Sequence, residues 1–378
     1  MLMTRNRTGV VFVHSSNEMY GADKVLLQVL KTLPEADKRA ATVWLPDDAA
    51  PSVFSLDAEL KRNNLRFEIR ALPILRRKYL SPRHLPKTLM MMIRTLLELR
   101  RLKPHTVYMT TSASLAVGIL ARILRVPHVV LHCQEVWRGR EAHVLGALAT
   151  AATECLCISN AAQDGLRGRV RRRSRVFLNG VSDYDRPLVD PIARGGVLKF
   201  LVASRWNSWK GHSTLLEAWD SGEPLGELVV VGGPPEMGKP VDVRGIVSRM
   251  KNRESVVIQG EVQDISALVD AVDFVVVPSD EPEPFGLIAI EAFARGRAVI
   301  GSDGGGLSEI VDDAQTGRLF PLRDSAALRS IMQDLDSHQA QVMGAAARDS
   351  YLRSYSIEAF NSRFSSFWSE ILPPAGAK

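Results

Sequence analysis

The sequence predicts an α/β protein with two doubly wound parallel-sheet domains. Short β-branched runs alternate with segments of helical periodicity along almost the whole chain, a pattern typical of parallel sheets covered by helices. The 378 residues, 46% of them hydrophobic, suffice for two separate cores. A segment rich in Pro, Asp and Gly follows residue 181, and we expect the junction of the two domains at residue 185.

The N-terminal half begins with a predicted strand at 9–14 and a helix at 22–33. Between them, a loop delivers Gly21 to the start of the helix. Glycine lets a ligand approach the backbone closely, and a helix N-terminus favours an anion, so this loop is a candidate anion site or an ordinary turn. The later elements are expected as strands at 41–46, 65–73, 106–111, 126–133, 154–159 and 174–178, with helices near 51–63, from about 86 and at 114–124.

Polar residues cluster at the end of the strand at 126–133 and just beyond it. His132 lies at the end of this strand and Glu135 just beyond it, where ligands bind in open α/β sheets. His132 is a candidate site residue, although a lone histidine is usually structural. Glu135 and Arg138 are weaker candidates for a neighbouring substrate pocket.

Charge is divided unevenly. Residues 1–185 hold 29 Lys and Arg against 16 Asp and Glu, whereas the remainder holds 19 against 26. The basic half suits nucleic acid, anionic lipid or a phosphorylated substrate, and no nucleic-acid-binding motif accompanies it. Two segments concentrate this charge: the helix expected from about residue 86 with the loop before it, including Arg77 and Lys78, and the arginine-rich stretch 169–175.

Each basic segment has two interpretations. The Leu- and Met-rich helix can pack on the sheet, which we favour, or lie in a membrane interface. The arginine-rich stretch is a solvated loop, slightly favoured, or a contact with anionic lipid. No run of 18 apolar residues and no signal peptide is found, and the three cysteines lack metal-ligand spacing, so we expect a reduced, cytoplasmic setting.

The second half starts with a predicted strand from 197. The loop after it carries Arg205 and Lys210, separated by four residues, which can converge on a diphosphate. Gly232 and Gln259 stand at the ends of the next two expected strands. Helices from 325 and 339 lead to a C-terminal helix whose buried face should hold Phe360, Phe364 and Phe367.

The stretch 274–310 carries the strongest pattern. A buried strand at 274–277 leads through a loop into a helix at 286–295, with Glu283 before the helix and Glu291 inside it. Orphan N–H groups at this helix start suit a phosphate or a polyhydroxylated ligand. On spacing alone, the two carboxylates could equally be solvated surface charges.

This segment resembles the signature of the family 4 (GT4) retaining glycosyltransferases, which have the GT-B fold. The two glutamates with seven residues between them, the Pro-Phe-Gly entry and the following Gly304–Gly306 match, and Arg205 with Lys210 resembles the family's diphosphate clamp. The resemblance covers nearly the whole chain and is more specific in its second half. It implies two Rossmann-like domains facing a central cleft, residues 1–185 for the acceptor and 186–354 for the donor, with a C-terminal helix at about 355–372 crossing back.

The resemblance also implies roles for single residues. Glu283 and the backbone of Phe285, Gly286 and Leu287 would hold the transferred sugar, Glu291 the ribose, and Gly21 the distal phosphate. Gly232 and Gln259 would lie near the base, and His132 would contact the sugar. The loop before Gly21 keeps one of the family's usual two glycines, which weakens that assignment. The catalytic set implied is His132, Arg205, Lys210 and Glu283, with Glu135 and Arg138 near the acceptor.

The residues favour transfer of a sugar from a nucleoside diphosphate without a metal, since Arg205 and Lys210 can stabilise the leaving diphosphate and no Asp-x-Asp pair is placed to hold a cation. We expect no cofactor. The resemblance implies retention of configuration, and because no nucleophile is well placed to form a covalent intermediate, we expect departure and attack on the same face of the sugar. A nucleotide-sugar-binding protein without turnover and a GT-B nucleotide-sugar epimerase stay open. A nicotinamide-dependent oxidoreductase would require the motif Gly-x-Gly-x-x-Gly after a strand, and the sequence has no such motif.

The basic N-terminal half suits a glycan acceptor linked to polyprenyl diphosphate, and surface polysaccharide assembly at the inner face of the cell membrane, where the protein would be peripheral. We expect no nucleic acid partner. The sequence does not specify the nucleotide, the sugar, the linkage or the oligomeric state.

Overall fold

The computed structural model describes residues 9–49, 54–76, 82–189, 196–235 and 238–372. Backbone contacts divide the chain into two compact units, one formed by residues up to Phe177 and from Asn361 onward, the other by Leu178–Phe360. The sequence places these boundaries at 185 and about 355. The difference arises because the segment after Phe177 pairs with the segment before the C-terminal helix, where the Val181 N–H donates to the Tyr355 carbonyl at 3.0 Å.

The first unit contains a parallel sheet in the order β3-β2-β1-β4-β5-β6-β7. The chain winds outward from β1 in one direction and from β4 in the other, so the winding reverses between these two strands. The strands are β1 Val10–Val13, β2 Ala41–Pro46, β3 Phe67–Arg70, β4 Thr106–Met109, β5 His128–Cys133, β6 Glu154–Cys157 and β7 Ser174–Val176.

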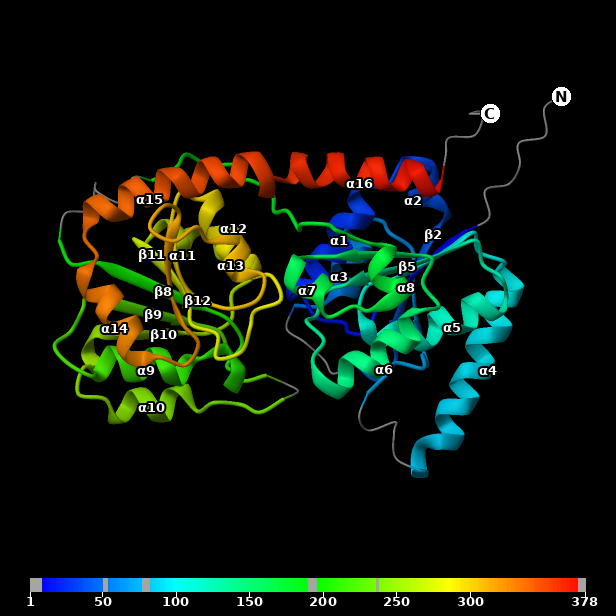
Figure 1. Cartoon of the computed structure of the whole chain (residues 1–378), viewed down its shortest axis with the longest axis horizontal. Helices are drawn as coiled ribbons and strands as arrows, with labels where there is room; N and C mark the ends of the chain where they lie inside the picture. Colours follow the sequence, from blue (N-terminus) through cyan, green and yellow to red (C-terminus); the bar gives the residue numbers. More distant parts are fainter. Residues whose placement is uncertain (1–8, 50–53, 77–81, 190–195, 236–237, 373–378) are drawn as a thin grey trace. The chain divides into compact units, whose positions relative to one another are not determined.

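Helices cover both faces of this sheet, as the alternation in the sequence predicts. Helices α4, α5 and α6 pack in succession, and α1 packs with α3 (Figure 1). The helices are α1 Gly21–Thr32, α2 Glu35–Ala40, α3 Leu56–Arg62, α4 Leu85–Leu102, α5 Leu115–Ile123, α6 Gly139–Ala149, α7 Asn160–Asp164 and α8 Gly168–Arg172.

Helix α4 differs from the favoured expectation. Met91, Thr95 and Leu99 are buried, whereas most of its other apolar side chains are exposed. The Leu- and Met-rich composition therefore does not reflect core packing alone. Arg77 and Lys78, in the preceding basic loop, lie outside the described residues.

The C-terminal helix α16, Ile357–Ile371, supplies core to the first unit from the far end of the chain. The Phe364 ring contacts Tyr108, Phe177 and Trp368, and the Trp368 indole donates to Asp37 Oδ2 at 3.0 Å. The prediction that Phe360, Phe364 and Phe367 are buried is confirmed.

The second unit contains a parallel sheet in the order β10-β9-β8-β11-β12-β13. Its strands are β8 Lys199–Ala203, β9 Glu227–Val231, β10 Val256–Gln259, β11 Phe274–Val277, β12 Ala298–Asp303 and β13 Gly317–Pro321. Its α-helices are α9 His212–Asp220, α10 Val243–Arg249, α11 Ser266–Asp270, α12 Leu287–Ala294, α13 Leu307–Ile310, α14 Ser325–Asp334 and α15 Ser337–Ser350, followed by a π-helical turn at Tyr351–Tyr355.

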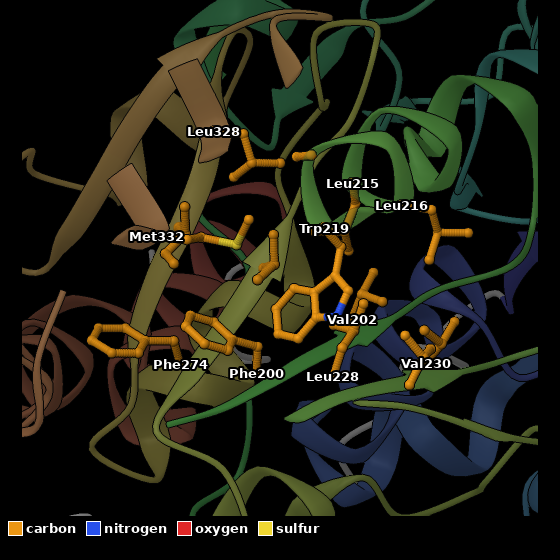
Figure 2. Close-up of a cluster of buried hydrophobic side chains, with 14 of the residues drawn as sticks. Phe200, Val202, Leu215, Leu216, Trp219, Leu228, Val230, Phe274, Leu328 and Met332 are labelled. Atoms are coloured by element: carbon orange, nitrogen blue, oxygen red, sulfur yellow. The ribbon is translucent and has the colours of Figure 1, made fainter. Parts of the chain in front are cut away.

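The core of this unit lies between the sheet and the helices α9, α10 and α14. Phe200 of β8 pairs with Phe274 of β11, and their rings stack with centroids 5.7 Å apart (Figure 2). Trp219 of α9 meets the edge of Phe200, while Leu328 and Met332 of α14 complete the cluster. This packing fixes β8 and β11 as neighbours, which determines where their following loops meet.

All three cysteines are free and buried. Within the described ranges, we find no helix with both the length and the apolar character needed to cross a membrane.

Candidate functional site

The second unit brings two predicted residues together at the centre of its sheet. The winding reverses between β8 and β11, and ligands bind beyond the strand ends at such a switch point. The loop after β8 carries Lys210, and the loop after β11 carries Glu283. The Lys210 Nζ lies 2.8 Å from Glu283 Oε2. A cation and a carboxylate therefore meet where this fold places ligands.

A close approach of the two loops makes this pair possible. Gly211 adopts φ +69°, and a Cβ there would lie 1.7 Å from the Pro278 carbonyl oxygen. Only glycine combines that conformation with that contact. Lys210, the residue before it, also places its ammonium 4.1 Å from the centroid of the Trp209 ring, a cation–π contact.

Glu283 is held from several sides. Its side chain is buried and accepts a hydrogen bond of 2.8 Å from the Ser279 hydroxyl as well as the Lys210 contact. Its carbonyl accepts from the Gly306 N–H at 2.7 Å, and Gly305, at φ +74°, pairs with it in a short β-bridge. The glycine run after β12 thus fixes the backbone of Glu283.

Helix α12 begins directly after this carboxylate. Its N-cap, Gly286, adopts φ +97°, and Phe285 is buried, with its ring in a T-shaped contact with that of Tyr355. The helix spans Leu287–Ala294, slightly shorter than the expected 286–295, and it is almost wholly buried. Glu291 is the one charged residue within it and is itself 7% exposed. Burying a carboxylate costs free energy unless it has partners, so Glu291 differs from an ordinary surface residue.

Tyr184 shares the surroundings of Glu291. Burial raises the pKa of the Tyr184 phenol well above its usual range, and the negative charge of Glu291 adds to this effect. Tyr184 stays protonated at physiological pH and can donate a hydrogen bond. No sequence motif marks Tyr184, because it stands in the Pro- and Asp-rich segment at the start of the second unit.

The remaining donor-side candidates lie at the same edge of the sheet. Arg205 is half-buried in the loop after β8. Gly232 follows β9 with φ +132°, and a Cβ there would lie 2.1 Å from the Ser204 carbonyl oxygen. Gln259 ends β10, is exposed, and accepts from the Gly232 N–H at 3.2 Å. The second unit therefore gathers these candidates at the carboxyl ends of β8, β9, β10 and β11.

A buried histidine also borders this edge. His212 starts α9, and its Nε2 lies 3.4 Å from the Ser204 hydroxyl. Burial, with a smaller contribution from the Lys210 charge, lowers the pKa of His212 to about 4. It is neutral at pH 7 and adds no positive charge to the site.

In the first unit, Gly21 opens α1 close to the switch between β1 and β4. A polar cluster that the sequence analysis missed supports this loop. His14 contacts Asp23 at 2.9 Å, and His14 also hydrogen-bonds Thr110. Asp23 accepts from the Ser16 hydroxyl at 2.8 Å. Asp23, in the first turn of α1, was the sequence signal for this cluster, since an acidic residue at that position commonly stabilises a helix N-terminus.

The placement of His132 does not support its expected contact with a sugar. The imidazole is 1% exposed and lies edge-on to Tyr108 and Phe177. Its Nδ1 shares a hydrogen bond of 2.9 Å with the Tyr108 hydroxyl. Burial lowers the pKa of His132 to about 3, so it is neutral at pH 7. His132 belongs to the aromatic core beneath α16, the structural alternative left open by the sequence.

Glu135 and Arg138 lie beyond β5 and are not brought together by any contact described. Glu135 is half-buried and accepts from the Ser112 N–H at 3.3 Å and from the Gln134 N–H at 3.2 Å. Burial raises the pKa of Glu135 to about 7. Arg138 is exposed and precedes α6. A carboxyl that titrates near neutrality at a strand end can exchange a proton with a bound hydroxyl.

The arginine-rich stretch forms α8 and the start of β7. Arg171 lies 2.8 Å from Asp164, and Arg175 lies 2.8 Å from Glu370, so two of its arginines already have acidic partners. In the described part of the chain, no group of three or more His, Cys, Asp or Glu side chains is arranged to hold a metal ion.

Comparisons with known proteins agree with this architecture. Residues 198–337 match the family model described as Glycosyl transferases group 1. A solved structure of Anabaena Alr3699/HepE in complex with UDP and glucose superimposes with a TM-score of 0.78 at 21% identity, covering 96% of this chain and 99% of that one. The fold is the α/β GT-B fold, with two Rossmann-like units.

Curated relatives are similar over part of their length. The glycogen synthase of Mycobacterium tuberculosis strain H37Rv is 39% identical over 225 residues, 58% of this chain and 52% of that protein. The lipopolysaccharide 1,2-N-acetylglucosaminetransferase of Salmonella typhimurium is 29% identical over 175 residues, 43% of this chain and 46% of that protein. The chain thus spans about half the length of the curated relatives it matches.

Proposed function

We propose that this protein is a retaining glycosyltransferase of the GT4 type, which transfers a sugar from a nucleoside diphosphate to a glycan or lipid-linked glycan. The observation that carries the proposal is the 2.8 Å contact between Lys210 and Glu283 at the switch point of the second sheet. It lies inside the segment that matches the glycosyltransferase family model. Lys210, with Arg205, can stabilise negative charge on a diphosphate without a metal ion.

The donor would occupy the carboxyl edge of the second sheet. Lys210 and Arg205 would bind the diphosphate, whose two negative charges compete with Glu283 for the ammonium. Glu283 and the N–H groups at the start of α12 would then hold the sugar hydroxyls, and Glu291 would accept from the ribose. Gly232 and Gln259 would lie near the base, and Gly21 stays a separate candidate phosphate site in the first unit.

The transfer step would proceed on one face of the sugar. The bond from the anomeric carbon to the diphosphate oxygen breaks while the acceptor oxygen bonds to the same face, and the departing phosphate takes the acceptor proton. Arg205 and Lys210 stabilise the charge that develops on the diphosphate. His132 is left out of this set because its side chain is buried in the aromatic core.

The acceptor would bind the first unit, with Glu135 and Arg138 nearby. We propose a polyprenyl-diphosphate-linked glycan at the cytoplasmic face of the membrane, and a place in surface polysaccharide synthesis. The basic N-terminal half suits such an anionic acceptor. The Salmonella relative is named a lipopolysaccharide 1,2-N-acetylglucosaminetransferase, and lipopolysaccharide is also a lipid-linked glycan.

Ligand-induced stabilisation tests the donor site. UDP-glucose is the first probe, because the Anabaena structural neighbour was solved with UDP and glucose, and GDP- and ADP-sugars follow. In buffer with EDTA, a ligand at about 100 times its Kd should stabilise the wild type by about 2.7 kcal/mol. Lys210→Ala and Glu291→Ala should lose that shift. The exposed residues Lys251 and Glu254 provide matched controls, Lys251→Ala and Glu254→Ala, which should keep it.

Product analysis tests the reaction. We expect transfer to a lipid-linked acceptor without added metal, with the anomeric configuration of the donor kept in the product by NMR. Lys210→Ala should lower kcat/KM by about 100- to 1000-fold, since it removes one group that stabilises the leaving charge. An inverted linkage would refute retention. Conversion of the donor to another nucleotide sugar without acceptor would instead indicate an epimerase, and binding without turnover a nucleotide-sugar-binding protein.

A further inference from the structure

Helix α4 presents an apolar row to solvent. Leu85, Leu89, Ile93 and Leu97 recur every four residues and are 49–64% exposed, and Met90 beside them is 53% exposed. Figure 1 shows α4 in cyan next to α5, the helix on which it packs. We call these five residues the α4 row. Single exposed apolar residues are normal on proteins, but five on one side of one helix mark an interaction surface.

A basic ridge borders the α4 row. Lys87, Arg94 and Arg101 are exposed and spaced by seven residues, which is close to two helical turns, so they share one side of the helix. The acidic residue of α4, Glu98, already contacts Arg101 at 3.2 Å and Arg70 at 3.7 Å. The helix therefore carries a net positive charge beside its apolar row.

Helix stability does not account for this ridge. Cations stabilise a helix near its C-terminus and are unfavourable near its N-terminus, and Lys87 stands in the first turn of α4. Arg94 stands in the middle, where the dipole has little effect. A function outside the helix explains both positions better.

We propose that α4 docks on an anionic lipid bilayer, with the α4 row at the boundary between headgroups and acyl chains and the basic ridge on lipid phosphates. An apolar face flanked by Lys and Arg is the pattern of helices that lie in a membrane interface. Charge favours this occupant over an uncharged apolar partner, since each basic residue near an anionic surface adds to binding. The inference rests on α4 alone and does not require the proposed transfer reaction.

Vesicle co-sedimentation of the full chain tests this surface. The probes are phosphatidylcholine vesicles with and without one-third phosphatidylglycerol. We expect binding to the anionic vesicles that weakens with added salt. The triple variant Lys87→Ser/Arg94→Ser/Arg101→Ser should lower the partition coefficient on the order of 100-fold. The triple variant Leu89→Ser/Ile93→Ser/Leu97→Ser should lower it at least about tenfold, because the apolar anchor is lost.

Two matched controls separate α4 from other surfaces. Val257→Ser/Val342→Ser removes exposed apolar residues from the second unit, and Arg169→Ser/Arg172→Ser removes charge from α8. Both should bind as the wild type does. The proposal is overturned if neither α4 variant weakens binding, if the α8 variant abolishes it, or if the wild type binds neutral vesicles equally well.

Light scattering without lipid tests whether the α4 row instead joins two copies of the chain. A wild-type dimer that the apolar α4 variant dissociates, together with no vesicle binding, would make the surface an interface between copies and overturn the proposal. The UDP-glucose thermal shift should be the same in wild type and all α4 variants. A negative thermal-shift result would therefore not affect the membrane proposal, and a negative vesicle-binding result would not affect the proposed donor site.

Discussion

Gly211 is the residue whose backbone lets the loop carrying Lys210 lie against the loop carrying Glu283. The substitution Gly211→Ala adds a Cβ at φ +69° and 1.7 Å from the Pro278 carbonyl oxygen. We expect it to lower the free energy of unfolding of the second unit by about 2–4 kcal/mol, through backbone strain and displacement of the loops. Urea denaturation measures the change.

Gly260 is the matched control for this prediction. It follows β10, and a Cβ there would meet no heavy atom within 4 Å. Gly260→Ala should change the free energy of unfolding by less than about 0.5 kcal/mol. Equal effects of the two substitutions would mean that the close approach at Gly211 does not constrain the loops.

His132 provides a pH-dependent prediction. Its pKa falls from 6.5 to about 3 on folding because burial disfavours the charged imidazole. Between these values the unfolded chain binds a proton that the folded chain does not, so the free energy of unfolding decreases as pH falls below about 6.5. The contribution of His132 is fully present above pH 6.5. Between the two pKa values, the free energy of unfolding falls with a slope that approaches about 1.4 kcal/mol per pH unit.

The variant His132→Phe removes this titration and should flatten the loss of stability between pH 6 and pH 4, measured by urea denaturation across that range. His338→Gln, on the exposed side of α15, is the control and should leave the wild-type slope unchanged. An unaltered slope in His132→Phe would show that the imidazole is not held neutral in the folded core.

The sequence predicts residues well where local chemistry decides their position. Gly286 and Glu283 stand in one strand-loop-helix segment whose local pattern predicts its elements, although Gly305, Gly306 and Lys210 also hold Glu283. His132 depends on distant residues instead. Alternate residues of a strand face opposite sides of the sheet, and the side that His132 faces is covered by Tyr108, Phe177 and, beyond them, Phe364 of α16. A strand-end position alone cannot reveal that cover.

At the scale of elements, α16 completes the core of the first unit from the far end of the chain. Phe364 is fully buried and contacts Tyr108, Phe177 and Trp368. Phe364→Ala should lower the free energy of unfolding of the first unit by about 3–5 kcal/mol, through lost burial and the cavity left behind. Scanning calorimetry should show the first unit's transition at lower temperature.

Leu352 is the control for that prediction. It stands in the π-helical turn before α16 and is 52% exposed. Leu352→Ala should change the free energy of unfolding of either unit by no more than about 0.5 kcal/mol. If Phe364→Ala behaved like Leu352→Ala, the helix would contribute little to the first core.

Elements were predictable where periodicity was strong and long. The strands of both sheets and helices such as α14 and α15 were expected close to their observed places. Helix α6 was missed, since its short apolar pattern is interrupted by Gly146. The environment of α4 was misjudged, because an apolar stripe predicts that a helix face is sheltered but does not say by what.

At the scale of the whole molecule, two units with separate cores predict two unfolding transitions. The proposed donor residues Arg205, Lys210, Glu283 and Glu291 all belong to the second unit. A ligand stabilises the folded form that it binds, in proportion to RT ln(1 + [L]/Kd). We therefore expect UDP-glucose to raise the second unit's transition by several degrees and to leave the first nearly unchanged, as measured by scanning calorimetry.

The assignment of the two transitions comes from the variants. Phe364→Ala lowers the first unit's transition and Gly211→Ala lowers that of the second, so each peak is identified without ligand. In Phe364→Ala the nucleotide should still raise the second peak, because the donor residues and their supporting core of Phe200, Phe274 and Trp219 are untouched. A shift confined to the first peak would move the nucleotide to the N-terminal unit and remove the basis for Lys210 and Glu283 as its binding residues.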